Sequence, residues 1–255
     1  MTTWLLAPLV GLVVGLVMGG LGGGGAVLSV PVLVYVLGQP AHPATTISLV
    51  VVLFGAFVGL VSMRGSGRVA WRTGLVFGGL GIAGSIAGAR LSYAADARLL
   101  LGSFAVLLAA VAVLMWRSAD RDQSVSTGPG DVSVGKLVPT ALGIGALTGF
   151  FGVGGGFATV PALALVMRMP PGRATATSLV VICVNSVAAL LTRIAGKGVS
   201  GIPWLLVLTF AVGTGVGTSL GTRVSGRLHG AHLMRAFAVF LVVIAVVVGV
   251  QTALA

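Results

Sequence analysis

The strongest constraint on the fold is a run of glycines that interrupts an uncharged hydrophobic stretch and recurs in the second half of the chain. The first run, 19–25, reads GGLGGGG and is followed by Pro31; the second, 149–156, reads GFFGVGGG and is followed by Pro161. In a helix interior, each glycine costs about 1 kcal/mol relative to alanine. We therefore expect the backbone to break in both runs.

The two runs belong to a longer internal repeat. A shift of 130 residues superposes them, and further along a shift of 133 aligns Trp71 with Trp204 and Arg90 with Arg223. We interpret the chain as one unit of about half its length present twice. The expected organisation is a first membrane repeat at 1–116, a polar linker at 117–136 and a second membrane repeat at 137–255.

Composition indicates a lipid environment. Of the 255 residues, 57% are hydrophobic and 7% are charged, and the mean hydropathy is +1.14, which predicts a polytopic membrane protein. The net charge of +11 is scattered at the ends of apolar segments, so we do not expect nucleic acid as a partner. The single cysteine, Cys183, excludes a disulfide framework and a thiolate metal cluster, and its expected role is packing.

The glycine segments are expected to form re-entrant pairs. One continuous helix from Leu5 to Leu37 would be about 50 Å long, whereas the hydrocarbon core is about 30 Å thick. The halves, about Leu5 to Met18 and Ala26 to Leu37, would each reach only about 20 Å. A pair of half-helices that enters and leaves on the same face fits both lengths.

The basic residues of the connecting loops support this choice. Full crossings would place eight basic residues on one face and seven on the other, whereas re-entrant segments place eleven against four, as the positive-inside rule requires. The larger set is Arg64, Arg68, Arg72, Arg117, Arg121, Lys136, Arg168, Arg173, Arg223, Arg227 and Arg235, and the smaller set is Arg90, Arg98, Arg193 and Lys197.

The expected architecture is therefore an all-α polytopic membrane protein of two repeats. Each repeat has a re-entrant broken-helix pair and three transmembrane helices, near 45–63, 71–90 and 99–116 in the first repeat. Three crossings are an odd number, so the second repeat is inverted, both termini lie outside, and the linker lies in the cytoplasm.

Inverted repeats with broken helices place a binding site where the breaks meet near the midplane. Free amides at the start of each second half-helix bind anions, and two such ends offset about one negative charge without an arginine or lysine in the hydrocarbon. We take the expected substrate-binding residues from the glycines and nearby polar side chains. They are Gly22, Gly24, Gly25, Ser29, Thr45, Ser48, Gly152, Gly154, Gly155, Gly156, Thr159, Thr175, Ser178 and Asn185.

Other glycines recur every fourth residue, as in helix-packing surfaces. We expect them to pack helices rather than bind a ligand. They are Gly11, Gly15 and Gly19, then Gly84 and Gly88, and finally Gly213, Gly217 and Gly221.

Several motifs together resemble the TauE/SafE family of sulfite and sulfonate exporters. They are the paired glycine segments, the sequences ATTISL at 44–49 and ATATSL at 174–179, and the sequences GAR at 88–90 and GTR at 221–223. The resemblance implies a carrier of small sulfur-containing or organic anions in the bacterial inner membrane. We expect sulfite or organosulfonate export by alternating access. A passive anion channel, or an uptake carrier for another oxyanion or a carboxylate, stays open.

We expect no enzymatic activity, because no serine or cysteine has an intramembrane histidine or acid beside it, and no cofactor or metal. The expected partners are the small anion and the lipid bilayer, with a homodimer left open. Arg90 and Arg223 should extend to the interfaces. The coupling ion is not determined, because the histidines and acids lie in or beside loops, His42 among them.

Overall fold

The computed structural model describes residues 2–23, 25–119, 134–197, 202–225, 239 and 241–250. These residues form helices joined by loops and turns, and no strand occurs among them. In chain order the helices are α1 (Thr2–Leu21), α2 (Ala26–Pro31), the π-helix η1 (Val32–Val36), α3 (Ala41–Ser62), α4 (Trp71–Ser92), α5 (Ala97–Ala119), α6 (Val134–Phe151), α7 (Gly156–Leu165), α8 (Pro171–Lys197) and α9 (Trp204–Ser225), followed by a final apolar helical segment at 241–250.

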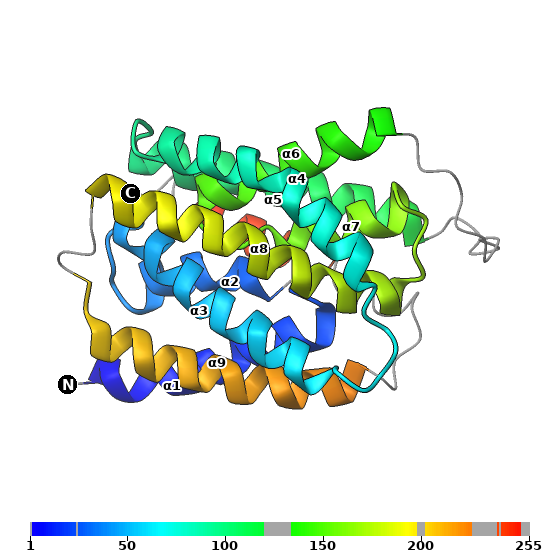
Figure 1. Ribbon diagram of the computed structural model, residues 1–255. Helices are drawn as coiled ribbons and strands as arrows, with labels where there is room; N and C mark the ends of the chain where they lie inside the picture. The colour runs from blue at the N-terminus through cyan, green and yellow to red at the C-terminus, as the bar shows by residue number, and fades with distance from the viewer. Residues whose placement is uncertain are drawn as a thin grey trace.

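The helices lie roughly along one direction in three tiers (Figure 1). Helices α1 and α9 form one outer tier, and α4 and α6 lie in the opposite one. Helices α3 and α8 lie between them and contact each other. The two central helices therefore come from different halves of the chain, as do the members of each outer pair.

Each outer pair packs through glycine. A Cβ atom at Gly15 of α1 would overlap the backbone of Thr214 in α9, and one at Gly84 of α4 would overlap the backbone of Leu142 in α6. The other expected packing glycines behave in the same way and have no room for a side chain. They are Gly11, Gly19, Gly88, Gly213, Gly217 and Gly221. The packing role expected for these glycines is confirmed.

The central helices α3 and α8 run in opposite directions. Arg193, near the end of α8, reaches Thr45, near the start of α3. Leu179, early in α8, comes within 3.0 Å of the Cβ position of Gly59, late in α3. A shift of 130 residues relates the first halves of these two helices, so equivalent segments of the two repeats are antiparallel at the centre of the molecule.

The outer surface is apolar. Along α9, exposed apolar side chains follow one stripe, which includes Leu205, Leu208, Val212, Val216 and Leu220. An apolar surface of this extent is not suited to water. Among the described residues, 4 helices are long and apolar enough to cross a membrane: Ala41–Ser62, Trp71–Ser92, Gly172–Gly196 and Trp204–Arg223.

The first helix of each pair is longer than expected. Helix α1 has 20 residues and α6 has 18, so α1 extends to about 30 Å at the usual helical rise, and the expectation that it ends near Met18 is wrong. Packing of Gly15 and Gly19 against α9 explains why the helix continues through glycines that weaken it locally. The second members are short, as expected, and α2 widens into the π-helix η1 after Pro31, which lacks a backbone donor.

The expected spans 45–63, 71–90 and 99–116 correspond to α3, α4 and α5. Most of the expected linker lies outside the described residues, which leave out 120–133. Gly24 of the first glycine run lies outside them as well.

Candidate functional site

The first backbone break separates α1 from α2 through glycines in the left-handed region. Gly22 has a φ of 66° and Gly23 a φ of 75°, values that side chains with a Cβ atom rarely adopt. The Gly23 amide donates to the carbonyl of Met18 at 2.8 Å, and the Gly23 carbonyl accepts from the Ala26 amide at 3.0 Å. The expected break is confirmed, and glycine is required there by the backbone itself.

The second break repeats this arrangement between α6 and α7. Gly152, Gly154 and Gly155 have φ values of 69°, 71° and 63°. Gly155 is the N-cap residue of α7, and its carbonyl accepts from the Thr159 amide at 2.9 Å. Equivalent contacts hold the two breaks: a Cβ atom at Gly25 would overlap Met18, and one at Gly155 would overlap Thr148.

The two breaks meet at the centre of the molecule. A Cβ atom at Gly156 would overlap the carbonyl oxygen of Gly23, and Ile182 of α8 lies beside both glycines. Each break also rests on the opposite repeat, because Gly22 contacts Thr175 and Gly152 contacts Thr45. These two contacts correspond to each other under the shift of 130 residues.

Three of the expected polar ligands are already hydrogen-bonded to the backbone. The Thr45 hydroxyl donates to the His42 carbonyl at 2.7 Å, and the Thr159 hydroxyl donates to the Gly155 carbonyl at 2.7 Å. The Ser178 hydroxyl lies 2.8 Å from the Gly22 carbonyl. In this conformation, these hydroxyls support the local backbone around the breaks.

Other buried polar side chains have no hydrogen-bond partner among the described residues. The hydroxyls of Ser29, Ser48 and Thr175, all expected ligands, belong to this set, and so does the hydroxyl of Ser186. Buried polar groups are nearly always paired in native proteins, so an unpaired group calls for an explanation such as a ligand or water. The Ser186 hydroxyl lies against Gly154 at the second break, whereas Thr175 meets Gly22 at the first break with its methyl group and backbone.

Asn185 takes a different position from the hydroxyls. Its side-chain amide lies where a Cβ atom at Gly81 of α4 would be, and neither amide atom has a partner among the described residues. Its neighbour Ser186 adjoins the second break instead and was not among the expected ligands. Adjacent residues on a helix point in different directions, but only the helix orientation shows which of the two faces the break.

Arg193 corrects an expectation about charge. The sequence suggested that it lies in a loop, but it belongs to α8, and its side chain is 1% exposed. It is the largest fully buried side chain among the described residues. In a sequence, an arginine that follows an apolar segment fits both a helix that ends before it and a helix that continues past it. The pattern therefore did not show that Arg193 is part of the helix.

Arg90 and Arg223 are exposed in the last turns of α4 and α9, as expected for residues at span ends. His42 lies in the first turn of α3, with its Nε2 atom 3.2 Å from the Ser92 carbonyl oxygen. Within the described part of the chain, no group of three or more histidine, cysteine or acidic side chains could hold a metal ion.

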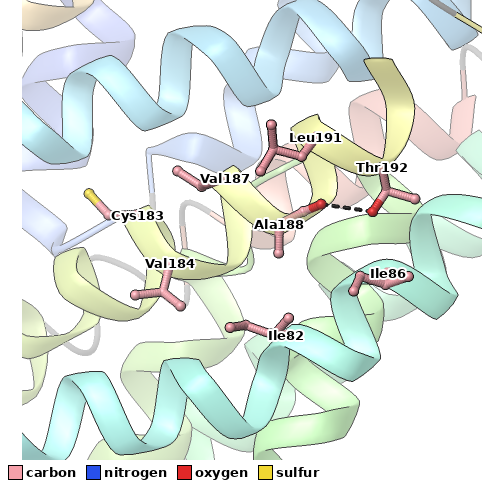
Figure 2. A pocket seen from close by; sticks show the side chains of 8 residues that line it. All are labelled: Ile82, Ile86, Cys183, Val184, Val187, Ala188, Leu191 and Thr192. Carbon is pink, nitrogen blue, oxygen red and sulfur yellow. Dashed lines mark hydrogen bonds between the residues drawn. The ribbon is translucent and has the colours of Figure 1, made fainter. Parts of the chain in front are cut away.

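A groove of about 560 Å³ opens between α4 and α8 on the outer surface (Figure 2). Its walls are apolar and include Cys183, Val187 and Leu191. Its one hydroxyl, that of Thr192, donates to the Ala188 carbonyl at 2.8 Å. The groove therefore suits hydrocarbon and offers no free donor to an anion.

Two broken helices within a set of long apolar helices define a helical membrane protein of the transporter class. The chain belongs to the TauE/SafE family: the family model described as "Sulfite exporter TauE/SafE" matches residues 7–248.

The relatives have transporter names. A "Probable membrane transporter protein" of Xylella fastidiosa strain Temecula1 is 34% identical over 244 residues, which cover 92% of this chain and 90% of that protein. YunE of Bacillus subtilis, also named a probable membrane transporter protein, is 26% identical over 235 residues, covering 83% of this chain and 84% of that protein. No solved structure matches the chain. Family and names together make the chain a membrane transporter.

Proposed function

We propose that the chain is an alternating-access carrier of small anions, exporting sulfite or a small organosulfonate, with the anion bound where the two glycine breaks meet. The observation that carries the proposal is the contact of Gly23 with Gly156, together with the buried, unpaired hydroxyls of Ser29, Thr175 and Ser186. The sulfur oxyanion comes from the description of the family.

The chemistry of the breaks suits an anion. Helix α7 begins at Gly156, and α2 with η1 forms the equivalent segment in the first repeat. Free amides at the start of a helix attract negative charge, with about half an elementary charge at each end. Hydroxyls such as those of Ser29 and Ser186 are neutral donors that an anion can accept from, and glycine lets a ligand approach the backbone.

We further propose that the two repeats lie in opposite orientations across the bacterial inner membrane, with both termini outside and the linker in the cytoplasm. The antiparallel contact of α3 and α8 and the reciprocal contacts of Gly22 with Thr175 and Gly152 with Thr45 support this arrangement. Equivalent elements on opposite faces allow alternating access, because one repeat can adopt the conformation of the other.

The test is a flux measurement with purified protein in liposomes. Sulfite, sulfoacetate, sulfate, thiosulfate and acetate are offered in turn, and influx and counterflow are recorded. A carrier gives saturable flux, and an anion loaded on one side accelerates exchange of a labelled anion from the other. Flux that neither saturates nor shows counterflow would indicate a passive channel, and no flux of any of these anions would contradict the proposal.

A further inference from the structure

Arg193 carries a positive charge into the interior of the protein. Its side chain is 1% exposed and lies among α3, α4, α6 and its own helix α8. The equivalent position in the first repeat is Met63, which is also buried. A charged residue therefore occupies this position in only one of the two repeats, so the fold of the repeat does not require the charge.

The guanidinium group is bonded only to neutral oxygen atoms. Nη1 donates to the hydroxyl of Thr45 at 2.7 Å, and Nη2 donates to the carbonyl of Gly149 at 2.8 Å and to the hydroxyl of Ser92 at 3.1 Å. The ring of Tyr93 lies 5.8 Å from the guanidinium carbon. None of the partners in the described part of the chain is acidic.

One donor of the guanidinium group remains unused. The Nε atom is buried and has no hydrogen-bond partner among the described residues. A buried charge is unfavourable unless it is paired, and an ionisable residue inside a membrane protein usually marks a functional site. The side chain thus has both an uncompensated charge and a free donor.

These contacts adjoin the second glycine break. Gly149 lies in the last turn of α6, just before Gly152, and Thr45 contacts both Gly152 and the Arg193 guanidinium. A change in the bonds of Arg193 would therefore act directly on the backbone that forms the proposed site.

We propose that Arg193 is the charge-recognition residue for the transported anion. On binding, the anion replaces some of the hydrogen bonds to Thr45, Ser92 and Gly149 and accepts from the Nε donor. A guanidinium group and an oxyanion can form two parallel hydrogen bonds with both partners ionised, which adds geometric specificity as well as energy. This inference rests on the proposed function and concerns the same site.

The shape of the guanidinium group specifies the class of anion. Its Nε and Nη donors form a planar fork that matches two oxygen atoms of one ligand. A sulfite, sulfonate or carboxylate group offers such a pair, whereas chloride offers one spherical acceptor. Arg193 therefore favours oxyanions over halides, a selectivity that lysine at this position would not reproduce.

The test compares binding of sulfite and chloride to purified protein by isothermal titration calorimetry. We expect Arg193→Met, which installs the residue of the first repeat, to weaken sulfite binding at least about tenfold. Arg193→Lys keeps the charge and should narrow the preference for sulfite over chloride. Arg90→Gln removes an exposed arginine and should leave both affinities within about twofold.

A purely structural clamp would give a different result. Arg193→Met and Arg193→Lys would then lower the apparent melting temperature, while the folded protein would keep the parental sulfite affinity and selectivity, and the inference would be overturned. If Arg193→Met does not fold, the preference of Arg193→Lys for sulfite over chloride decides between anion recognition and a structural role. A parent protein that binds neither sulfite nor the other oxyanions tested would refute the proposed function itself, whereas parental binding retained in both variants refutes only the role of Arg193.

Discussion

The hydroxyl of Ser178 lies 2.8 Å from the carbonyl oxygen of Gly22, across 156 positions of the chain. This bond joins the second repeat to the backbone break of the first. The same hydroxyl lies 2.8 Å from the Thr175 carbonyl, and its one hydrogen is shared between the two acceptors. The equivalent hydroxyl in the first repeat, that of Ser48, has no partner among the described residues, so equivalent serines have different roles.

Ser178→Ala should destabilise the protein. The substitution leaves the Gly22 carbonyl without this donor in a buried position, and such a loss costs about 1–3 kcal/mol. Ser48→Ala is the matched control, since it removes a hydroxyl that is bonded to nothing in the described structure, and it should leave stability almost unchanged. Unfolding in mixed micelles with increasing dodecyl sulfate measures both. Equal losses in the two variants would contradict the different roles assigned to these serines.

Ser29→Ala should weaken anion binding without unfolding the protein. The Ser29 hydroxyl is buried and unpaired, so we assign it to the anion, and one hydrogen bond to a charged ligand is worth about 1.5–3 kcal/mol, or about ten- to a hundredfold in affinity. Its repeat equivalent Thr159 bonds the Gly155 carbonyl, and Thr159→Val should reduce stability as well. Titration of sulfite into each variant separates the two effects; parental affinity in Ser29→Ala would remove this residue from the site.

Gly84→Ala should lower stability through helix packing. Its added methyl group would overlap the Leu142 carbonyl in α6, and overpacking of this kind costs about 1–3 kcal/mol. Gly79→Ala lies in the same helix and meets no atom within 4 Å, so it serves as the control. Apparent melting temperatures in detergent report the difference. If both variants melt like the parent, α4 and α6 do not pack as closely as described.

Gly156→Ala should separate the two breaks. Its methyl group would overlap the Gly23 carbonyl and the side chain of Ile182, so the proposed site should lose at least about tenfold in sulfite affinity. Gly20→Ala, in the first glycine run, meets no atom within 4 Å and should bind like the parent. Folded Gly156→Ala protein with unchanged affinity would mean that the anion does not bind where the breaks meet.

The proposed orientation is testable with reporters. A phosphatase reporter fused after Ala255 should be active, because we expect the C-terminus to lie outside, and one inserted within 117–136 should be inactive. The physical reason is the excess of basic residues in the loops expected on the face opposite both termini, because loops rich in basic residues stay in the cytoplasm. A fusion after Ala255 that reads as cytoplasmic would overturn this topology.

Much of the fold follows from local features of the sequence. Gly22 and Gly152 adopt left-handed φ values, which glycine permits because it has no Cβ atom. The two backbone breaks could therefore be predicted from the glycine runs, which superpose when the chain is aligned with itself. Spacing by four predicts the packing surfaces at Gly15 and Gly84 for the same reason, since residues four apart share a helix face.

The site could be predicted only in part. Thr175 was expected among the ligand donors, and the structure brings it against Gly22 at the first break. Asn185 was expected at the breaks but lies against Gly81, and Ser186 takes the place beside Gly154. The sequence places both residues on one helix, but the rotation of that helix depends on how α8 packs against α3 and α4.

By itself, then, the sequence determined where the backbone breaks, which segments are apolar and that one unit occurs twice, because hydrophobicity and glycine content are properties of neighbouring residues. Only the tertiary structure decided that α1 continues to Leu21, that Ser178 reaches Gly22 and that Arg193 is buried. Each of these features depends on a contact with a helix distant in the chain. The energy of such a contact cannot be inferred from the pattern of neighbouring residues.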